Sequence, residues 1–305
     1  MARTLLTGVT GRVGAAVADD LVRLGAPRPQ GLVRTQSAVS AVDDHAESLN
    51  YHPVAGDLDD IDSLQRAMRG VDRALLVSNV HPEQCRLQGN FVDAAAAIVD
   101  PPHLVKVSGL GSFPNSAVDS GRWHATTEAY IRSRKLSAHC LHPYFFMQNF
   151  AFSLPQVKET GILRSGVDGD TPIAMVDLRD IAAVAARLLL EPTRSPETVL
   201  PLTSNRSYTH HQVAQLLSQL LDQQINYKVQ SARELRRALE AAGQPAWHID
   251  IILQFNAAFD AGLAGQPSTH VATVLGQTPR TLEDYLSELS QSDAPTTGRN
   301  PFPNA

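Results

Sequence analysis

Residues 1–14 read Met-Ala-Arg-Thr-Leu-Leu-Thr-Gly-Val-Thr-Gly-Arg-Val-Gly, so a short apolar strand leads directly into Gly8-x-x-Gly11-x-x-Gly14. Gly8 permits a tight turn, Gly11 lets the backbone approach a ligand closely, and Gly14 lets the following helix pack on the strand. The start of that helix directs free N–H groups toward a bound anion. The stretch therefore predicts a pyrophosphate-binding turn in a dinucleotide site.

The segments after this turn support the prediction, because a glycine triplet alone also occurs in ordinary strand-to-helix turns. Residues 15–24 have the apolar spacing of an amphipathic helix. Gly25 and Pro27 then end that helix, and a second strand follows at residues 31–33. Strand, glycine turn, helix and second strand thus follow the order of a dinucleotide-binding βαβ unit.

The residue after the second strand predicts which dinucleotide is bound. About twenty residues beyond the glycines, NAD sites place an Asp or Glu on the ribose hydroxyls, whereas this chain has Arg34. A guanidinium can bind a 2′-phosphate through two hydrogen bonds, and Arg12 in the glycine turn can approach the same phosphate. We therefore expect NADP, with NADPH preferred over NADH. The alternative is that Arg34 is a solvated turn residue.

The composition is that of a soluble globular protein, with 43% hydrophobic and 19% charged residues among 305. A net charge of −5 without a basic run argues against nucleic acid or an anionic membrane as a partner. Cys85 and Cys140 are too few for a disulfide framework. The first strand leaves no room for a signal peptide, and the most apolar helix, 181–190, is too short for a bilayer. We expect a cytoplasmic monomer or homodimer that binds a small-molecule substrate.

Strands and helices alternate along the first half of the chain, which predicts an α/β fold with a doubly wound parallel Rossmann sheet. We expect strands at residues 4–7, 31–34, 51–55, 73–77, 103–108 and 138–142, and helices at about 13–24, 38–48, 60–68, 82–99 and 122–134. The second half is less regular. There we expect strands at 171–176, 199–203 and 224–229, and helices at 177–190, 209–221, 232–242, 246–262 and 281–289.

These elements predict two domains. A Rossmann domain covers residues 1–150, and 171–192 return to it; a smaller α/β substrate domain covers 151–290; and a flexible tail, rich in Pro, Asn, Thr and Ser, covers 291–305. The apolar helix at 246–262 is a candidate wall over the substrate, or alternatively a helix that only packs on the domain core.

Binding is expected at the carboxyl ends of the parallel strands, which meet at one edge of the sheet. We assign cofactor binding to Gly8, Thr10, Gly11, Arg12, Val13, Gly14, Arg34, Asp57, Leu58, Ser78, Asn79, Ser108, Pro143 and Tyr144. Asp57 is placed to meet the adenine edge or, alternatively, to cap the helix that begins near Asp60. Ser78 and Asn79 are expected to line the ribose region.

Several motifs resemble those of the NmrA-like branch of atypical short-chain dehydrogenase/reductases, over roughly residues 3–290. They are Thr7-Gly-x-Thr-Gly-x-x-Gly14 with Leu32-Val33-Arg34, Gly56-Asp57-Leu58, Lys106-x-Ser108, Trp123-His124-x-x-Thr127-Glu128, Pro143-x-Phe-Phe-Met-Gln-Asn149, Val176-Asp177-x-Arg-Asp-Ile-Ala182 and Leu275-Gly-x-x-Pro-Arg-Thr281. The resemblance implies a Rossmann domain carrying NADP(H) and a variable C-terminal domain over the substrate. Members include quinone, dye and carbonyl-type reductases, and also NADP-binding regulators without turnover.

The catalytic pair of typical short-chain dehydrogenases, Tyr-x-x-x-Lys, is missing from its expected place. The nearest match is Tyr130-x-x-x-Arg134, whose arginine cannot reproduce the role of the lysine, so we interpret Tyr130 as a packing residue. His124 and Glu128 are four residues apart on a helix and can hydrogen-bond. We expect His124 near the nicotinamide, giving a proton or a hydrogen bond to the substrate oxygen, with Glu128 orienting it. The alternative is a structural His–Glu pair.

Two more side chains are catalytic candidates, and two histidine motifs are not. Tyr144 follows the sixth strand and can face the substrate or pack beside its phenylalanine neighbours, and Ser108 can bind the substrate carbonyl or the ribose. His139-Cys140-x-His142 has metal-ligand residue types, but these side chains alternate across a strand, so no metal is expected. The family resemblance also leaves His142 unusual, because relatives usually have Arg before that proline. His210-His211 is interpreted as a surface pair.

The leading hypothesis is an NADPH-dependent reductase of a small, apolar, conjugated or aromatic carbonyl or quinone-type substrate. A conjugated acceptor delocalises the charge that arrives with the hydride, so positioning can suffice without a strong acid. One alternative is a non-enzymatic, NADP(H)-sensing regulatory protein. Another is a nucleotide-binding enzyme of a non-redox step such as isomerisation or cyclisation.

Overall fold

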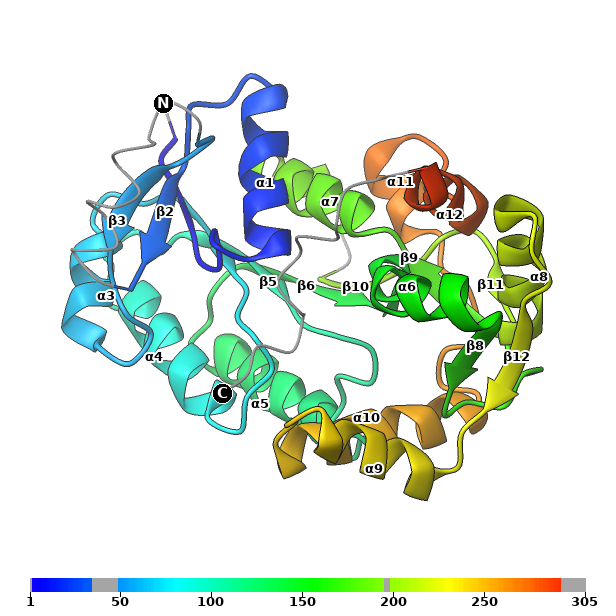
Figure 1. The fold of residues 1–305 in the computed structure, drawn as a ribbon. Coiled ribbons are helices and arrows are strands. Elements are labelled where there is room, and N and C mark those ends of the chain that lie inside the picture. The colour runs from blue at the N-terminus through cyan, green and yellow to red at the C-terminus, as the bar shows by residue number, and fades with distance from the viewer. Residues whose placement is uncertain (1, 35–48, 195–197, 292–305) are drawn as a thin grey trace.

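A computed structural model describes residues 2–34, 49–194 and 198–291 (Figure 1). Its largest sheet contains β1 (Thr4–Leu6), β2 (Gln30–Val33), β3 (His52–Ala55), β4 (Arg73–Leu76), β5 (His103–Val107), β6 (Ala138–Pro143) and β10 (Val199–Leu202). The strand order is β10-β6-β5-β4-β1-β2-β3, and every pairing is parallel. The predicted doubly wound α/β fold is confirmed. The order reverses between β1 and β4, the place where open α/β sheets bind ligands.

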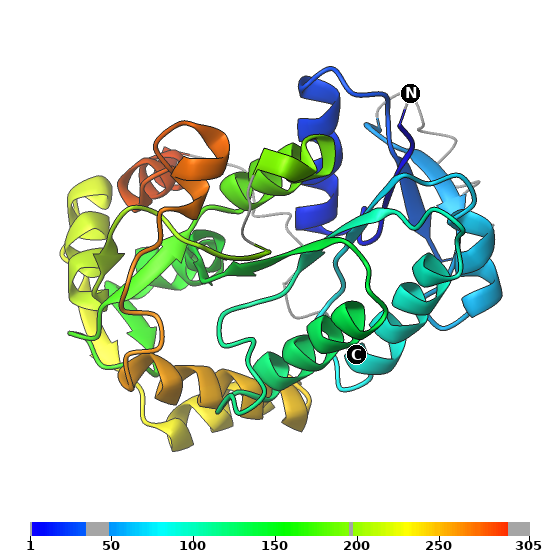
Figure 2. The same ribbon diagram turned by 180° about the vertical axis from the view of Figure 1, so that it is seen from behind.

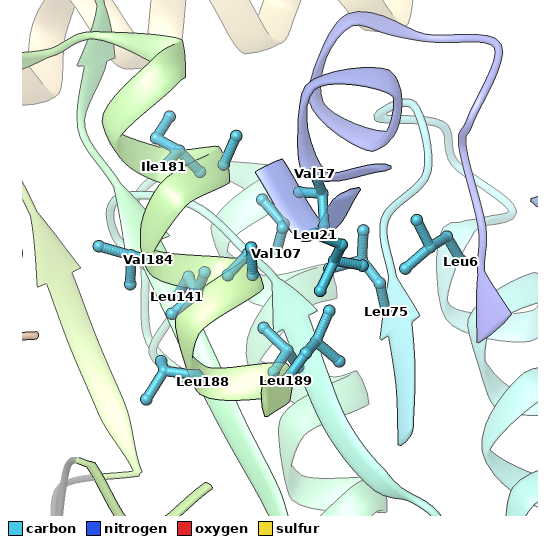
Figure 3. Close-up of a cluster of buried hydrophobic side chains, with 14 of the residues drawn as sticks. Leu6, Val17, Leu21, Leu75, Val107, Leu141, Ile181, Val184, Leu188 and Leu189 are labelled. Carbon is cyan, nitrogen blue, oxygen red and sulfur yellow. The ribbon is translucent and has the colours of Figure 1, made fainter. Parts of the chain in front are cut away.

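Helices cover both faces of this sheet (Figure 1). One face carries α1 (Arg12–Arg23), α7 (Leu178–Leu190) and α11 (His270–Leu275), and the other carries α3 (Ile61–Ala67), α4 (Gln84–Ala96) and α5 (Asp119–Ser133). Figure 3 shows the core under the first face, where Val17 and Leu21 of α1 meet Leu188 and Leu189 of α7 above the strands. Burial of these apolar side chains on both faces holds the parallel strands in place.

The second half of the chain adds two smaller sheets and five further helices to the described part of the structure. The sheets are β11 (Ser207–Tyr208), β9 (Ile173–Val176) and β7 (Phe145–Phe146), and β12 (Asn226–Val229) with β8 (Ile162–Ser165). The helices are α6 (Phe150–Thr160), α8 (His210–Leu221), α9 (Ala232–Ala241), α10 (Ala246–Asp260) and α12 (Leu282–Gln291). Short 3-10 turns lie at Met147–Asn149 and Pro192–Arg194. Of the helices described here, none is long and apolar enough for a membrane crossing.

Some of the expected elements lie outside the described residues, and two helices were not expected. The predicted helix at 38–48 and residues 292–305 of the predicted tail lie outside the described residues. No element was expected at α6, which contains the helix-breaking residue Pro155, or at the six-residue α11. In both cases the helix is held by packing in the core clusters, which local sequence does not report.

The interpretation of His210 as a surface residue is wrong. His210 is the first residue of α8, and its ring stacks on Tyr227 of β12 with 5.0 Å between the ring centres. Burial lowers the pKa of His210 to about 4, so the ring is neutral at physiological pH. His211, one residue later, is exposed as expected. The first turn of α8 docks against β12, and this tertiary contact covers one histidine and leaves the other in solvent.

Candidate functional site

The glycine turn between β1 and α1 is built so tightly that side chains do not fit. Gly8 has a φ of +64°, and a Cβ there would lie 2.9 Å from Val77 Cγ1. A Cβ on Gly14 would lie only 2.3 Å from the carbonyl oxygen of Gly8. No side chain caps the start of α1 at Gly11. Its first N–H groups are therefore available for an anion such as a pyrophosphate.

The predicted cofactor residues lie after the ends of successive strands of the parallel sheet. The glycine turn follows β1; Arg34 follows β2; Asp57 and Leu58 follow β3; Ser78 and Asn79 follow β4; Ser108 follows β5; and Pro143 and Tyr144 end and follow β6. Thr10 and Arg12 to Gly14 belong to the turn or to the first residues of α1. All of them thus lie at one edge of the sheet, as the strand directions require.

The alternative role of Asp57 as a helix cap is wrong. The cap of α3 is Asp60, whose carboxylate accepts a hydrogen bond from the backbone N–H of Ser63 at 3.1 Å. Asp57 instead accepts from the backbone N–H of Asp59 and lies 3.8 Å from Nε of Arg34. Its side chain is therefore left at the strand edge, where the adenine position was predicted.

The two arginines predicted to approach one phosphate lie in different surroundings. The side chain of Arg34 is 82% exposed and lies beside Asp57 after β2. The guanidinium of Arg12 lies 5.6 Å from the ring centre of Phe152 on α6, and burial lowers its pKa. Arg12 thus contacts α6 of the second half of the molecule (Figure 1), whereas Arg34 contacts Asp57. Their joint approach to one phosphate stays a prediction.

A buried polar cluster joins β5 and α5 beside this edge of the sheet. Lys106 is completely buried, and its ammonium donates a hydrogen bond to Ser108 Oγ at 2.8 Å. The same nitrogen lies 2.9 Å from Nδ1 of His124. Nε2 of Gln84 on α4 also lies 2.9 Å from that Nδ1. His124 is thus held at one ring nitrogen by two side chains from two other elements.

Glu128 is linked to the same cluster from the next turn of α5. Its Oε1 accepts a hydrogen bond from Ser108 Oγ at 2.6 Å and lies 2.8 Å from Nε2 of His142. The direct His124–Glu128 hydrogen bond expected from the sequence is not formed. Lys106 on β5 and Ser108 just after it, two residues apart in an extended segment, supply nearer partners to each residue. The two helix residues are therefore connected only through the strand.

The pKa values of the groups in this cluster are shifted, and the shifts define which groups are charged. Burial lowers the pKa of Lys106 to about 8, against the opposing effects of Cys140 and Glu128. Burial also lowers the pKa of His124 far below its usual value, and the nearby Lys106 charge adds to the effect. Burial alone would raise the pKa of Glu128, but hydrogen bonds from His142 and Ser108 and the charge of Lys106 lower it overall. At neutral pH the cluster therefore contains an ammonium, a carboxylate and a neutral His124.

His124, Ser108 and Glu128 of this cluster were predicted from the sequence as functional residues, whereas Lys106 and Gln84 were given no role. A signal for Lys106 is present in the strand His103-Leu-Val-Lys-Val107, where a lysine occupies a central position of a buried parallel strand. Such a lysine requires internal partners, because an unpaired buried charge is costly. Gln84 carries no comparable signal, since a glutamine at the start of a helix is ordinary.

The remaining candidates differ in their surroundings. Tyr144 is half-buried, and burial raises the pKa of its hydroxyl. Tyr130 packs at the α4–α5 contact, where its hydroxyl donates to Asp93 at 2.6 Å. This matches its interpretation as a packing residue. In the described ranges, no group of three or more His, Cys, Asp or Glu side chains is arranged to hold a metal ion.

Helix α10 packs on the start of α5. Both views show it alongside the first turns of α5 (Figures 1 and 2), and Ile251 and Ala258 pack with Val118 just before α5. Nε2 of Gln254 also donates to Asp119 at 2.9 Å. The helix therefore packs on α5, the helix that carries His124, which leaves both roles predicted for it open.

A family model described as the NmrA-like family matches residues 2–286, almost the whole chain. The chain belongs to the NmrA-like family. An NAD(P)H azoreductase from Xenophilus azovorans is 28% identical over 285 residues, which are 92% of this chain and 96% of the relative. A (4-alkanoyl-5-oxo-2,5-dihydrofuran-3-yl)methyl phosphate reductase from Streptomyces griseus is 29% identical over 299 residues, 95% and 99% of the two chains.

The fold of this NmrA-like protein is also found in solved structures. An NADPH-dependent quinone oxidoreductase from Escherichia coli, crystallised with NADPH, superposes with a TM-score of 0.82 at 24% identity. The match covers 94% of this chain and 99% of the other. At this identity the likeness establishes the shared fold.

Proposed function

We propose that this protein is an NADPH-dependent reductase that transfers a hydride to a small, apolar, conjugated or aromatic acceptor of the carbonyl or quinone type. The observation that carries the proposal is the position of His124. The ring is neutral, it is held at Nδ1 by Lys106 and Gln84, and its Nε2 side lies beside Gly109 just after β5. The names of the azoreductase, quinone oxidoreductase and phosphate reductase relatives support a reductase.

The residues at the strand ends fit a dinucleotide. The turn between β1 and α1 has no room for a side chain at Gly8 or Gly14, and it lies next to uncapped N–H groups of α1. Both features suit a pyrophosphate. The side chain of Arg34 is exposed and can bind a 2′-phosphate, although its Nε also lies 3.8 Å from the carboxylate of Asp57. We assign the dinucleotide to residues 1–150 with 171–192, and the covering of the substrate to 151–290. Within residues 151–290, the strand β10 pairs with β6 and so belongs to the main sheet.

The chain's own groups then act on the acceptor. When bound, the cofactor supplies the hydride. His124 donates a hydrogen bond from Nε2 to the acceptor atom that gains negative charge, and Lys106, which also donates to Ser108, holds the ring at Nδ1. Tyr144, which follows β6, is assigned to the substrate side of the site. A conjugated acceptor spreads its new charge, so a neutral donor is sufficient where an isolated ketone requires a stronger acid.

Replacement of Arg34 by alanine tests the cofactor preference. Loss of a charge-assisted contact to the 2′-phosphate is expected to raise the KM for NADPH about tenfold and to leave the KM for NADH nearly unchanged. Initial rates with both cofactors measure the change. Arg23→Ala, which removes an exposed arginine from the far end of α1, is the matched control. An equal loss with both cofactors would contradict a 2′-phosphate contact.

A panel of acceptors tests the reaction itself. We expect NADPH oxidation with a naphthoquinone, an azo dye and a conjugated enone, and rates at least about tenfold lower with an isolated cyclic ketone, because no strong acid faces the site. NADPH binding is measured in parallel by calorimetry. Tight binding without oxidation by any of the conjugated acceptors would favour the NADP(H)-sensing alternative and reject the reductase.

A further inference from the structure

An unbroken chain of hydrogen-bond contacts runs through the buried cluster from His142 to His124. His142 Nε2 lies 2.8 Å from Glu128 Oε1, and Ser108 Oγ lies 2.6 Å from the same oxygen. Lys106 Nζ lies 2.8 Å from Ser108 Oγ and 2.9 Å from His124 Nδ1. The chain crosses from β6 through α5 and β5 and back to α5. It is closed to bulk water along its length, since only His142 is partly exposed.

The contacts at Nδ1 determine which nitrogen of His124 carries the proton. The ammonium of Lys106 can only donate. The nitrogen that faces it must therefore be the acceptor, so the proton of the neutral ring is on Nε2. Among the described residues, none hydrogen-bonds to Nε2. Its N–H is therefore available to a substrate.

We propose that Lys106 is a positioning residue that fixes His124 as the Nε2–H tautomer, and that Ser108, Glu128 and His142 form a relay that returns a proton to Lys106. This inference rests on the proposed function, because it assigns the source of the proton that accompanies the hydride. Lys106 acts through His124 and does not touch the acceptor.

The proton movements balance along the chain. As the acceptor gains the hydride, its negatively charged atom takes the proton from Nε2 of His124, and Nδ1 takes one from the Lys106 ammonium. Lys106 is then a neutral amine, and the ring is neutral with its proton on Nδ1. His142 gives a proton to the Glu128 carboxylate as it takes one from solvent, and Ser108 passes its own proton to Lys106 as it receives the one now on Glu128, so that Glu128 is again a carboxylate and Lys106 an ammonium. After the product leaves, Nε2 takes a proton from solvent at the open substrate side, and the Nδ1 proton leaves through Lys106 and the same chain in the reverse direction, which resets the ring.

The surroundings of Lys106 suit this role. Burial lowers its pKa to about 8, so the ammonium gives up a proton more readily than an exposed lysine does. The titratable groups around it are Cys85 on α4, Cys140 on β6, Glu128 on α5 and the two histidines of the hydrogen-bond chain, His124 and His142. Glu128 is the carboxylate that balances its charge.

Nitrogen-15 NMR of histidine-labelled protein without cofactor tests the tautomer separately from turnover. We expect the wild-type His124 signals to show a protonated Nε2 and a bare Nδ1, unchanged between pH 8 and about pH 5.5, because its pKa lies far below the usual value. In Lys106→Met the pKa of the ring should rise but stay below that of an ordinary histidine, because the positive neighbour and the donor are gone while burial, the larger cause, remains. An Nδ1–H tautomer in the wild type, or the same spectra and titration in Lys106→Met, would overturn the proposal.

A second variant tests the tautomer of His124 independently, in case Lys106→Met does not fold. Gln84→Glu keeps the size of the side chain and puts a carboxylate acceptor against Nδ1 of His124. We expect Nδ1 to become protonated in this variant, as a tautomer or as an imidazolium. Retention of a bare Nδ1 beside the new carboxylate would contradict the assignment of that nitrogen by its neighbours.

Kinetics with an acceptor that the wild type reduces test the relay. Lys106→Met is expected to lower kcat about tenfold and to leave the KM for NADPH unchanged, since the residue lies behind the ring. Glu128→Gln can still accept from Ser108 but cannot pass a proton, so its solvent deuterium isotope effect on kcat should rise. Lys158→Met, an exposed lysine of α6, is the control. Wild-type kcat and isotope effect in both relay variants would reject the relay. Absence of any reducible acceptor would reject the function and leave the tautomer result standing.

Discussion

Replacement of Gly14 by alanine is expected to weaken NADPH binding about 100-fold, one of the two largest effects in this protein. The new Cβ would lie 2.3 Å from the Gly8 carbonyl oxygen and 2.8 Å from the Val9 nitrogen. These are backbone atoms, so the start of α1 must move away from the turn. Such displacement costs about 1–3 kcal/mol, and it also turns the free N–H groups of α1 away from the pyrophosphate.

Titration calorimetry with NADPH measures this loss, and thermal unfolding shows whether the fold survives. Gly89→Ala is the matched control, because Gly89 lies within α4 and a Cβ there would meet nothing closer than 3.9 Å. That change should leave binding intact and stabilise the protein by about 0.5–1 kcal/mol through helix propensity. Wild-type affinity in a folded Gly14→Ala protein would show that the pyrophosphate does not bind at this turn.

Replacement of His124 by phenylalanine is expected to lower kcat about 100-fold while the dissociation constant of NADPH stays the same. Phenylalanine fills the space of the imidazole but offers no N–H to the acceptor, and loss of one positioned donor typically has an effect of this size. Lys106 would lose one of its two partners, so we also expect a small drop in the unfolding temperature.

Single-turnover oxidation of bound NADPH isolates the hydride step for this comparison. His52→Phe, which changes an exposed histidine at the start of β3, controls for the substitution itself. Unchanged turnover in His124→Phe with intact NADPH binding would eliminate the catalytic role and leave His124 as a structural residue of the α5–β5 contact.

Local sequence was sufficient for most of the nucleotide-binding half. The glycine spacing defines a turn, apolar periodicity distinguishes strands from helices, and strictly alternating strands and helices require a parallel sheet with one binding edge. The helix at α6 was not found, because Pro155 interrupts its pattern and packing supplies its stability. Local patterns likewise placed Arg12 and Arg34 near the cofactor. They did not show that the guanidinium of Arg12 lies over the ring of Phe152, in the second half of the molecule.

The sequence by itself thus determined the fold, the glycine turn and the identity of the polar residues at the strand ends, because these depend on neighbours in the chain. Only the tertiary structure decided what each polar residue contacts. Two residues four apart on α5 were expected to pair, yet Lys106 on β5 and Ser108 just after it supply the partners of His124 and Glu128. A buried polar group takes its nearest partner in space, and for His124 those partners come from elements about 20 and 40 residues earlier in the chain.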